Sequence, residues 1–120
     1  MLLNKYILGV IVIQIAGAIA CASMASAETI RTASFEIKII RQCAEGNVSC
    51  DRVTYIGKDL NTGKSIRLKG KTVNSGNSYQ FLGYEFRNGK YLYSVNSNNL
   101  LQVYKGKKLI LEQQGTSIND

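Results

Sequence analysis

Apolar and polar residues alternate in short runs along most of this chain, and glycine or asparagine separates one run from the next. Phe35, Ile37 and Ile39 alternate with charged residues, which indicates a strand with one buried face. Later runs are rich in β-branched and aromatic residues, which favour strands. The predicted strands are Ser34–Arg41, Arg52–Ile56, Lys64–Lys71, Tyr79–Arg87, Lys90–Val95, Leu100–Tyr104 and Lys108–Gln113.

The segments between these runs indicate how the strands connect. Asp59–Gly63 predicts a turn that joins the second and third strands as a hairpin, and Asn88-Gly89 predicts a type I′ turn. The last four strands then form a meander. Val73–Ser78 is expected to be an exposed loop, and the polar tail from Gly115 is expected to be frayed. The predicted fold is therefore all-β, a small antiparallel barrel or sandwich of about seven strands.

The first 27 residues have the composition of a secretory signal. Lys5 supplies the positive charge, an uncharged apolar run follows, and Ala25-Ser26-Ala27 is a small-x-small cleavage site before Glu28. We expect a signal helix in residues 1–27 and a single secreted β domain in residues 28–120. The predicted location is the periplasm or the cell exterior.

Two other interpretations of this segment remain open, and they are the only membrane contacts that the sequence suggests. Tyr6–Ala27 holds no charge and is long enough to be a retained membrane anchor. Ala18-Ile19-Ala20-Cys21 is similar to a lipobox, which would make Cys21 a lipidated first residue.

Cys43 and Cys50 are the cysteines that remain after the signal. In an exported domain such a pair favours a disulfide over a redox or metal site. A reactive thiol pair usually needs the Cys-x-x-Cys spacing, which this chain lacks.

The whole chain carries a net charge of +7, and because Lys5 is the only charge in the signal, the remainder carries +6. This charge favours a protein partner with an acidic surface or an anionic envelope component, and export argues against nucleic acid. The candidate basic surface comprises Arg67, Lys69, Lys71, Lys105, Lys107 and Lys108. The alternative is a solvated face whose lysines prevent edge-to-edge association.

The absence of histidine excludes Ser-His-Asp and Cys-His catalysis, and no metal or cofactor motif is present. We therefore expect a protein that is not an enzyme. A carboxylate-based enzyme that uses Glu85 and Glu112 is the alternative. The tyrosines after the signal are expected to pack at the edge of the core, or else to form a protein interface.

One combination of residues resembles a known family. Cys50, a Val53-Thr54-Tyr55 strand, a Ser75-Gly76-Asn77-Ser78-Tyr79 loop and Lys105-Gly106 follow one another before a closing apolar strand. This order is similar to that of the small periplasmic and membrane-bound inhibitors of C-type lysozyme. The family usually has Ala-Arg where this chain has Asn77-Ser78, and its cysteines are placed differently.

The resemblance implies an eight-stranded antiparallel barrel. It also implies that Ser75 and Lys105 enter the cleft of the target enzyme, with Tyr79 in the same binding loop. We therefore expect an exported non-enzymatic binding protein, an inhibitor or immunity-type protein against an envelope-attacking enzyme such as lysozyme. A basic envelope-associated protein that binds anionic surface components is the alternative.

Overall fold

The computed structural model describes residues 26–44, 46–76 and 79–118, and every regular element in this part of the chain is a β-strand. The predicted signal helix and Cys21 lie outside the described residues. The described strands form one antiparallel sheet in the order β8-β7-β6-β5-β4-β3-β2-β1-β9. They are β1 (Ser26–Arg31), β2 (Phe35–Arg41), β3 (Val53–Asp59), β4 (Ser65–Asn74), β5 (Phe81–Asn88), β6 (Tyr91–Asn96), β7 (Leu100–Lys105), β8 (Lys108–Gln114) and β9 (Thr116–Ile118).

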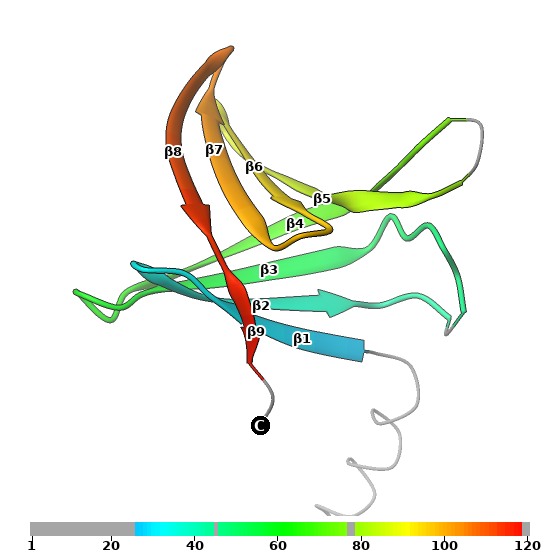
Figure 1. Cartoon of the computed structure of the whole chain (residues 1–120), viewed down its shortest axis with the longest axis horizontal. Coiled ribbons are helices and arrows are strands. Elements are labelled where there is room, and N and C mark those ends of the chain that lie inside the picture. Colours follow the sequence, from blue (N-terminus) through cyan, green and yellow to red (C-terminus); the bar gives the residue numbers. More distant parts are fainter. Residues whose placement is uncertain (1–25, 45, 77–78, 119–120) are drawn as a thin grey trace, which may run out of the picture.

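The sheet curls into a nearly closed barrel, which confirms the all-β antiparallel prediction. Figure 1 shows β1–β4 side by side, with β5–β8 curving away from them until β8 returns and β9 lies against β1. The inward side chains of alternating positions fill the interior. Ile37, Tyr55, Phe86 and Leu101 are at most 1% exposed, and the ring centroids of Tyr55 and Phe86 lie 5.2 Å apart.

The prediction of seven strands is wrong at both ends of the domain. Ser26–Arg31 forms β1 and pairs with β2, and the tail after Gly115, expected to be frayed, forms β9 on the other edge of β1. Both strands contribute few apolar side chains to the interior, and Ile30 is the one fully buried side chain of β1. The segments of β1 and β9 therefore lack the alternation of apolar and polar residues that would predict strands. Pairing of their backbones with neighbouring strands determines that they form β-structure.

Gln113 and Gly115 hold the seam where the barrel closes. Oε1 of Gln113 accepts hydrogen bonds from the Thr32 hydroxyl at 2.7 Å and from the Ser34 amide at 3.2 Å. The Gly115 amide donates to Asn99 O at 2.9 Å, and a Cβ on Gly115 would lie 2.5 Å from Cγ2 of Ile30. The C-terminal strand thus crosses from β7 to β1 at a position where only glycine fits.

Two local predictions also need correction. Asn88 pairs with Tyr91, so the β5–β6 turn consists of Gly89-Lys90, and Gly89 alone has a positive φ. This matches a type II′ turn rather than type I′. Val73 and Asn74, expected in a loop, continue β4 past a register shift between them.

Candidate functional site

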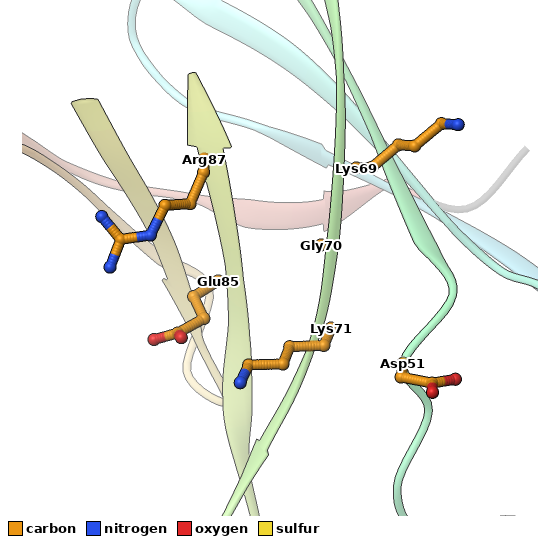
Figure 2. A pocket seen from close by; sticks show the side chains of 6 residues that line it. All are labelled: Asp51, Lys69, Gly70, Lys71, Glu85 and Arg87. Carbon is orange, nitrogen blue, oxygen red and sulfur yellow. The ribbon is translucent and has the colours of Figure 1, made fainter. Parts of the chain in front are cut away.

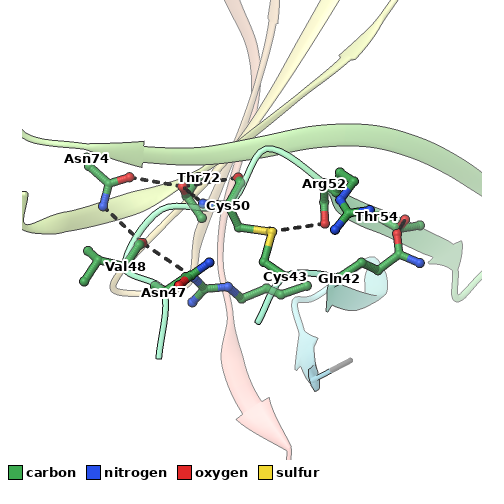
Figure 3. Close-up of a disulfide and its surroundings, with 10 residues drawn as sticks. Gln42, Cys43, Asn47, Val48, Cys50, Arg52, Thr54, Thr72 and Asn74 are labelled. Carbon is green, nitrogen blue, oxygen red and sulfur yellow. Dashed lines mark hydrogen bonds between the residues drawn. A yellow bond between two sulfur atoms is a disulfide. The ribbon is translucent and has the colours of Figure 1, made fainter. Parts of the chain in front are cut away.

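The disulfide connects Cys43 to Cys50 in the segment between β2 and β3, as the sequence predicts, with 5.8 Å between the Cα atoms. Cys50 is 4% exposed and belongs to the hydrophobic core. The disulfide therefore ties an exposed loop to the interior of the barrel (Figure 3).

The disulfide loop is bonded in turn to the end of β4. The Cys50 amide donates to Oγ1 of Thr72 at 2.9 Å, and the Thr72 amide donates to Cys50 O at 2.8 Å. The side-chain amide of Asn74 donates to Val48 O at 3.3 Å and to Tyr79 O at 3.5 Å. Asn74 thus bridges the disulfide loop and the β4–β5 loop. Figure 3 shows its hydrogen bond to Val48. We call the described residues of these two loops, 43–44, 46–50, 74–76 and 79–80, the loop pair.

Ser75 and Tyr79, both predicted to bind a partner, belong to the loop pair. The Ser75 amide donates to Gln80 O at 2.9 Å, and the Gln80 amide donates to Oγ of Ser75 at 3.1 Å. Ser75 therefore closes the neck of the β4–β5 loop. Tyr79 is 74% exposed with φ of +54°, and Val48 in the other loop is 50% exposed. The loop pair thus presents two apolar side chains to solvent.

Arg41 supports the same end of the barrel from β2. One of its guanidinium nitrogens donates to Asn47 O at 2.7 Å, and its guanidinium carbon lies 6.0 Å from the centroid of the Phe81 ring. Neither Arg41 nor Asn74 belongs to a motif that would mark it in the sequence. Their role depends on which loops the sheet brings together, and the local pattern carries no sign of it.

Lys105 does not join Ser75 in one site. Lys105 pairs with Tyr91, which pairs with Asn88 at the end of β5, whereas Asn74, next to Ser75, pairs with Phe81 at the start of β5. At about 3.3 Å per residue, the length of β5 separates the two positions by roughly 23 Å along the strand. Lys107 and Lys108 lie with Lys105 around the β7–β8 turn.

Arg67, Lys69 and Lys71 are exposed along β4, as the alternation predicts. Lys69 and Lys71 flank Gly70 in a groove of approximately 430 Å³, which Glu85 and Arg87 of β5 and Asp51 also line. Figure 2 shows Lys71 directed toward Glu85, with Arg87 on the same side and Lys69 on the other side of β4. The groove therefore mixes three cations with two carboxylates, which weakens it as a site for anions.

Most of the tyrosines belong to the core. Tyr55 and Tyr84 are buried, and Tyr93 packs edge-on against Tyr55 with 5.4 Å between the ring centroids. The Tyr84 hydroxyl donates to Oε1 of Glu28 at 3.3 Å. Burial raises the pKa of Tyr84, and the Glu28 carboxylate raises it further. Tyr104 is half-buried outside the core, and Tyr79 lies on the loop pair and is exposed.

Among the described residues, no group of three or more Cys, Asp or Glu side chains lies close enough together to hold a metal ion. No helix in this part of the chain is long and apolar enough to cross a membrane. Comparisons of the chain with protein-family models, with curated proteins and with solved structures found no match.

Proposed function

We propose that this protein is an exported, non-enzymatic binding protein that blocks an envelope-attacking enzyme through the loop pair. The observation that carries the proposal is the bridge at Asn74, which joins the disulfide loop to the loop that exposes Tyr79. The disulfide is compatible with an oxidising, exported location.

The hydrogen bonds of Asn74 and Ser75 connect the described parts of the two loops, and this arrangement favours binding. A loop that is already ordered loses little conformational entropy when a partner docks, so more of the contact energy contributes to affinity. Tyrosine is common among the residues that dominate binding energy, because it offers a large rigid surface and a polar hydroxyl. Tyr79 has this role in the proposal, and Ser75 holds the loop that carries it.

The resemblance to lysozyme inhibitors provides the target for the test. The exported, oxidised protein is titrated against C-type lysozyme on a cell-wall substrate, together with Tyr79→Ala and Lys105→Ala variants. We expect stoichiometric inhibition by the wild type and a loss of about tenfold or more in affinity for Tyr79→Ala. The Lys105→Ala variant serves as the matched control and is expected to inhibit normally, because Lys105 lies far from the loop pair.

Two outcomes would contradict the proposal. The first is no inhibition at any concentration. The second is inhibition that depends on Lys105 and not on Tyr79. That result would instead support Lys105 as a residue that enters the cleft of the target enzyme, as the family resemblance implies.

The second candidate function is binding to anionic envelope components through the basic residues of β4. It is supported by the exposure of Arg67 and Lys69, neither of which forms an ion pair in the described part of the chain. Attraction between exposed charges is screened by salt, so retention on anionic vesicles should weaken steeply between low and physiological ionic strength. An Arg67→Gln/Lys69→Gln variant that is retained as well as the wild type would exclude this candidate.

A further inference from the structure

An apolar cavity of approximately 240 Å³ opens between β2 and the strands β5–β8, at the opposite end of β5 from the loop pair. Phe35, Tyr91 and Tyr93 supply aromatic walls, and Leu101, Val103 and Leu111 supply aliphatic ones. Ile110 and Asn88 complete the lining. Barrels of about eight strands have room for side chains or for one small ligand. The volume of the cavity lies below the range for drug-sized ligands, so the cavity suits a short hydrocarbon chain.

Lysines gather at this end of the barrel because two turns touch there. The Gly106 amide of the β7–β8 turn donates to Lys90 O of the β5–β6 turn at 3.3 Å. Figure 1 shows β5–β8 rising together to this end. The two turns and their flanks carry Lys90, Lys105, Lys107 and Lys108, all exposed, and none forms an ion pair in the described part of the chain.

The strand register directs two of these lysines to the cavity side of the sheet. Lys105 pairs with Tyr91, which lines the cavity, and Lys108 pairs with Lys105. Residues directly opposite each other in an antiparallel pair project from the same face. Lys105 and Lys108 therefore extend from the cavity face at its rim.

The acidic residue Asp59 lies opposite Phe35, which lines the cavity. Its carboxylate accepts hydrogen bonds from the amides of Asn61 and Thr62 at 2.8 and 3.2 Å. Asp59 is thus engaged by its own turn, and the rim keeps an excess of positive charge.

We propose that this cavity binds a small anionic amphiphile, a free medium-chain fatty-acid anion, with the chain among the aromatic and aliphatic walls and the carboxylate at Lys105 and Lys108. The proposal does not rest on the proposed inhibitor function, because it uses different residues at the other end of β5.

The test is calorimetric titration of the exported, oxidised protein with sodium octanoate, and in parallel with the neutral alcohol octanol. A Lys105→Gln/Lys108→Gln variant removes the two rim charges. A Lys38→Gln/Lys58→Gln variant removes two charges from exposed positions of β2 and β3 and is the matched control. A Leu111→Trp variant fills the cavity, and its far-ultraviolet circular dichroism checks that it folds.

We expect saturable octanoate binding that falls about tenfold in the rim variant and is unchanged within a factor of two in the control. Octanol should bind the wild type and the rim variant equally, and folded Leu111→Trp should bind neither ligand. Absence of saturable octanoate binding to the wild type would overturn the proposal. Equal losses in the two double variants would overturn it too, because the effect would then reflect net charge. Binding to phosphatidylglycerol vesicles without binding to free octanoate would likewise overturn the free anion as the ligand.

Discussion

At the scale of single residues, Asn74 forms the hydrogen bonds that connect the two loops of the proposed site. Its side-chain amide donates to carbonyl groups in both loops, and its Oδ1 accepts a hydrogen bond from the Thr72 hydroxyl at 3.0 Å. We predict that Asn74→Ala lowers the free energy of unfolding by about 1 kcal/mol, the usual net value of such hydrogen bonds. The measurement is urea denaturation. Asn61→Ala, a change in an exposed turn, is the control and should stay within about 0.5 kcal/mol of the wild type.

Tyr55 gives a prediction about pH. Burial raises the pKa of Tyr55, and the neighbouring Tyr93 raises it further, so the folded protein favours the neutral phenol more than the unfolded chain does. The stability that this group contributes is fully present below the unfolded pKa of about 10 and is lost as the pH rises above it. The loss approaches about 1.4 kcal/mol per pH unit.

Because lysines titrate in the same alkaline range, the informative quantity is the difference between the wild type and Tyr55→Phe. We expect the variant to lose stability less steeply than the wild type between pH 10 and about 11.5, as measured by denaturation at each pH. Parallel curves for the two proteins would contradict the prediction, because they would show that Tyr55 titrates as freely in the folded protein as in the unfolded chain.

At the scale of elements, β9 determines how the barrel closes. A Cβ at position 115 would lie 2.5 Å from Cγ2 of Ile30 and 2.8 Å from Asn99 O. We predict that Gly115→Ala lowers the free energy of unfolding by about 1–3 kcal/mol, the range for overpacked positions. It should also accelerate amide hydrogen exchange at Thr29–Arg31, which pair with β9.

Gly76→Ala is the matched control, because a Cβ at that exposed position would meet no atom within 4 Å and the backbone has no positive φ. Its stability and its exchange rates in β1 should match those of the wild type. If Gly115→Ala behaves like Gly76→Ala, the seam does not require glycine.

At the scale of the whole molecule, the disulfide links the loop pair to the core. Loop-closure entropy for so short a ring corresponds to about 2.5 kcal/mol of stability. We predict a loss of this size for a Cys43→Ser/Cys50→Ser variant, measured by denaturation. The variant should also bind its partner more weakly than the oxidised wild type, because the disulfide loop is no longer ordered beforehand. A variant with lower stability but normal affinity would separate the disulfide from binding.

The parts of the fold that the sequence predicts are those in which burial alternates along a strand. Ile37 and Ile39 in β2 and Tyr84 and Phe86 in β5 alternate with exposed or half-buried residues, so their strands are visible in the pattern. β1 and β9 are not visible, because their pairing is mainly a matter of backbone hydrogen bonds between edges. Closure of the barrel is a property of the whole sheet that no short window of sequence contains.

For the candidate site, too, the sequence predicts the features that depend on local motifs and not those that depend on how the strands pair. The disulfide of Cys43 and Cys50 was predictable because it follows from their number and context. Ser75 and Tyr79 share one loop because their motif is local, and their role in binding stays a prediction. The separation of Lys105 from Ser75 depends on strand direction and register across β4–β7, and the family resemblance placed them together. The role of Asn74 depends on two loops that are remote in the sequence.

The most direct test of the loop pair as the binding surface is a chemical-shift titration of the ¹⁵N-labelled, oxidised protein with C-type lysozyme. We predict that the amide signals that change are concentrated in residues 46–50 and 74–80, and that those of Lys105–Lys108 stay in place. Absence of any change, or changes centred on the β7–β8 turn, would contradict the proposed surface.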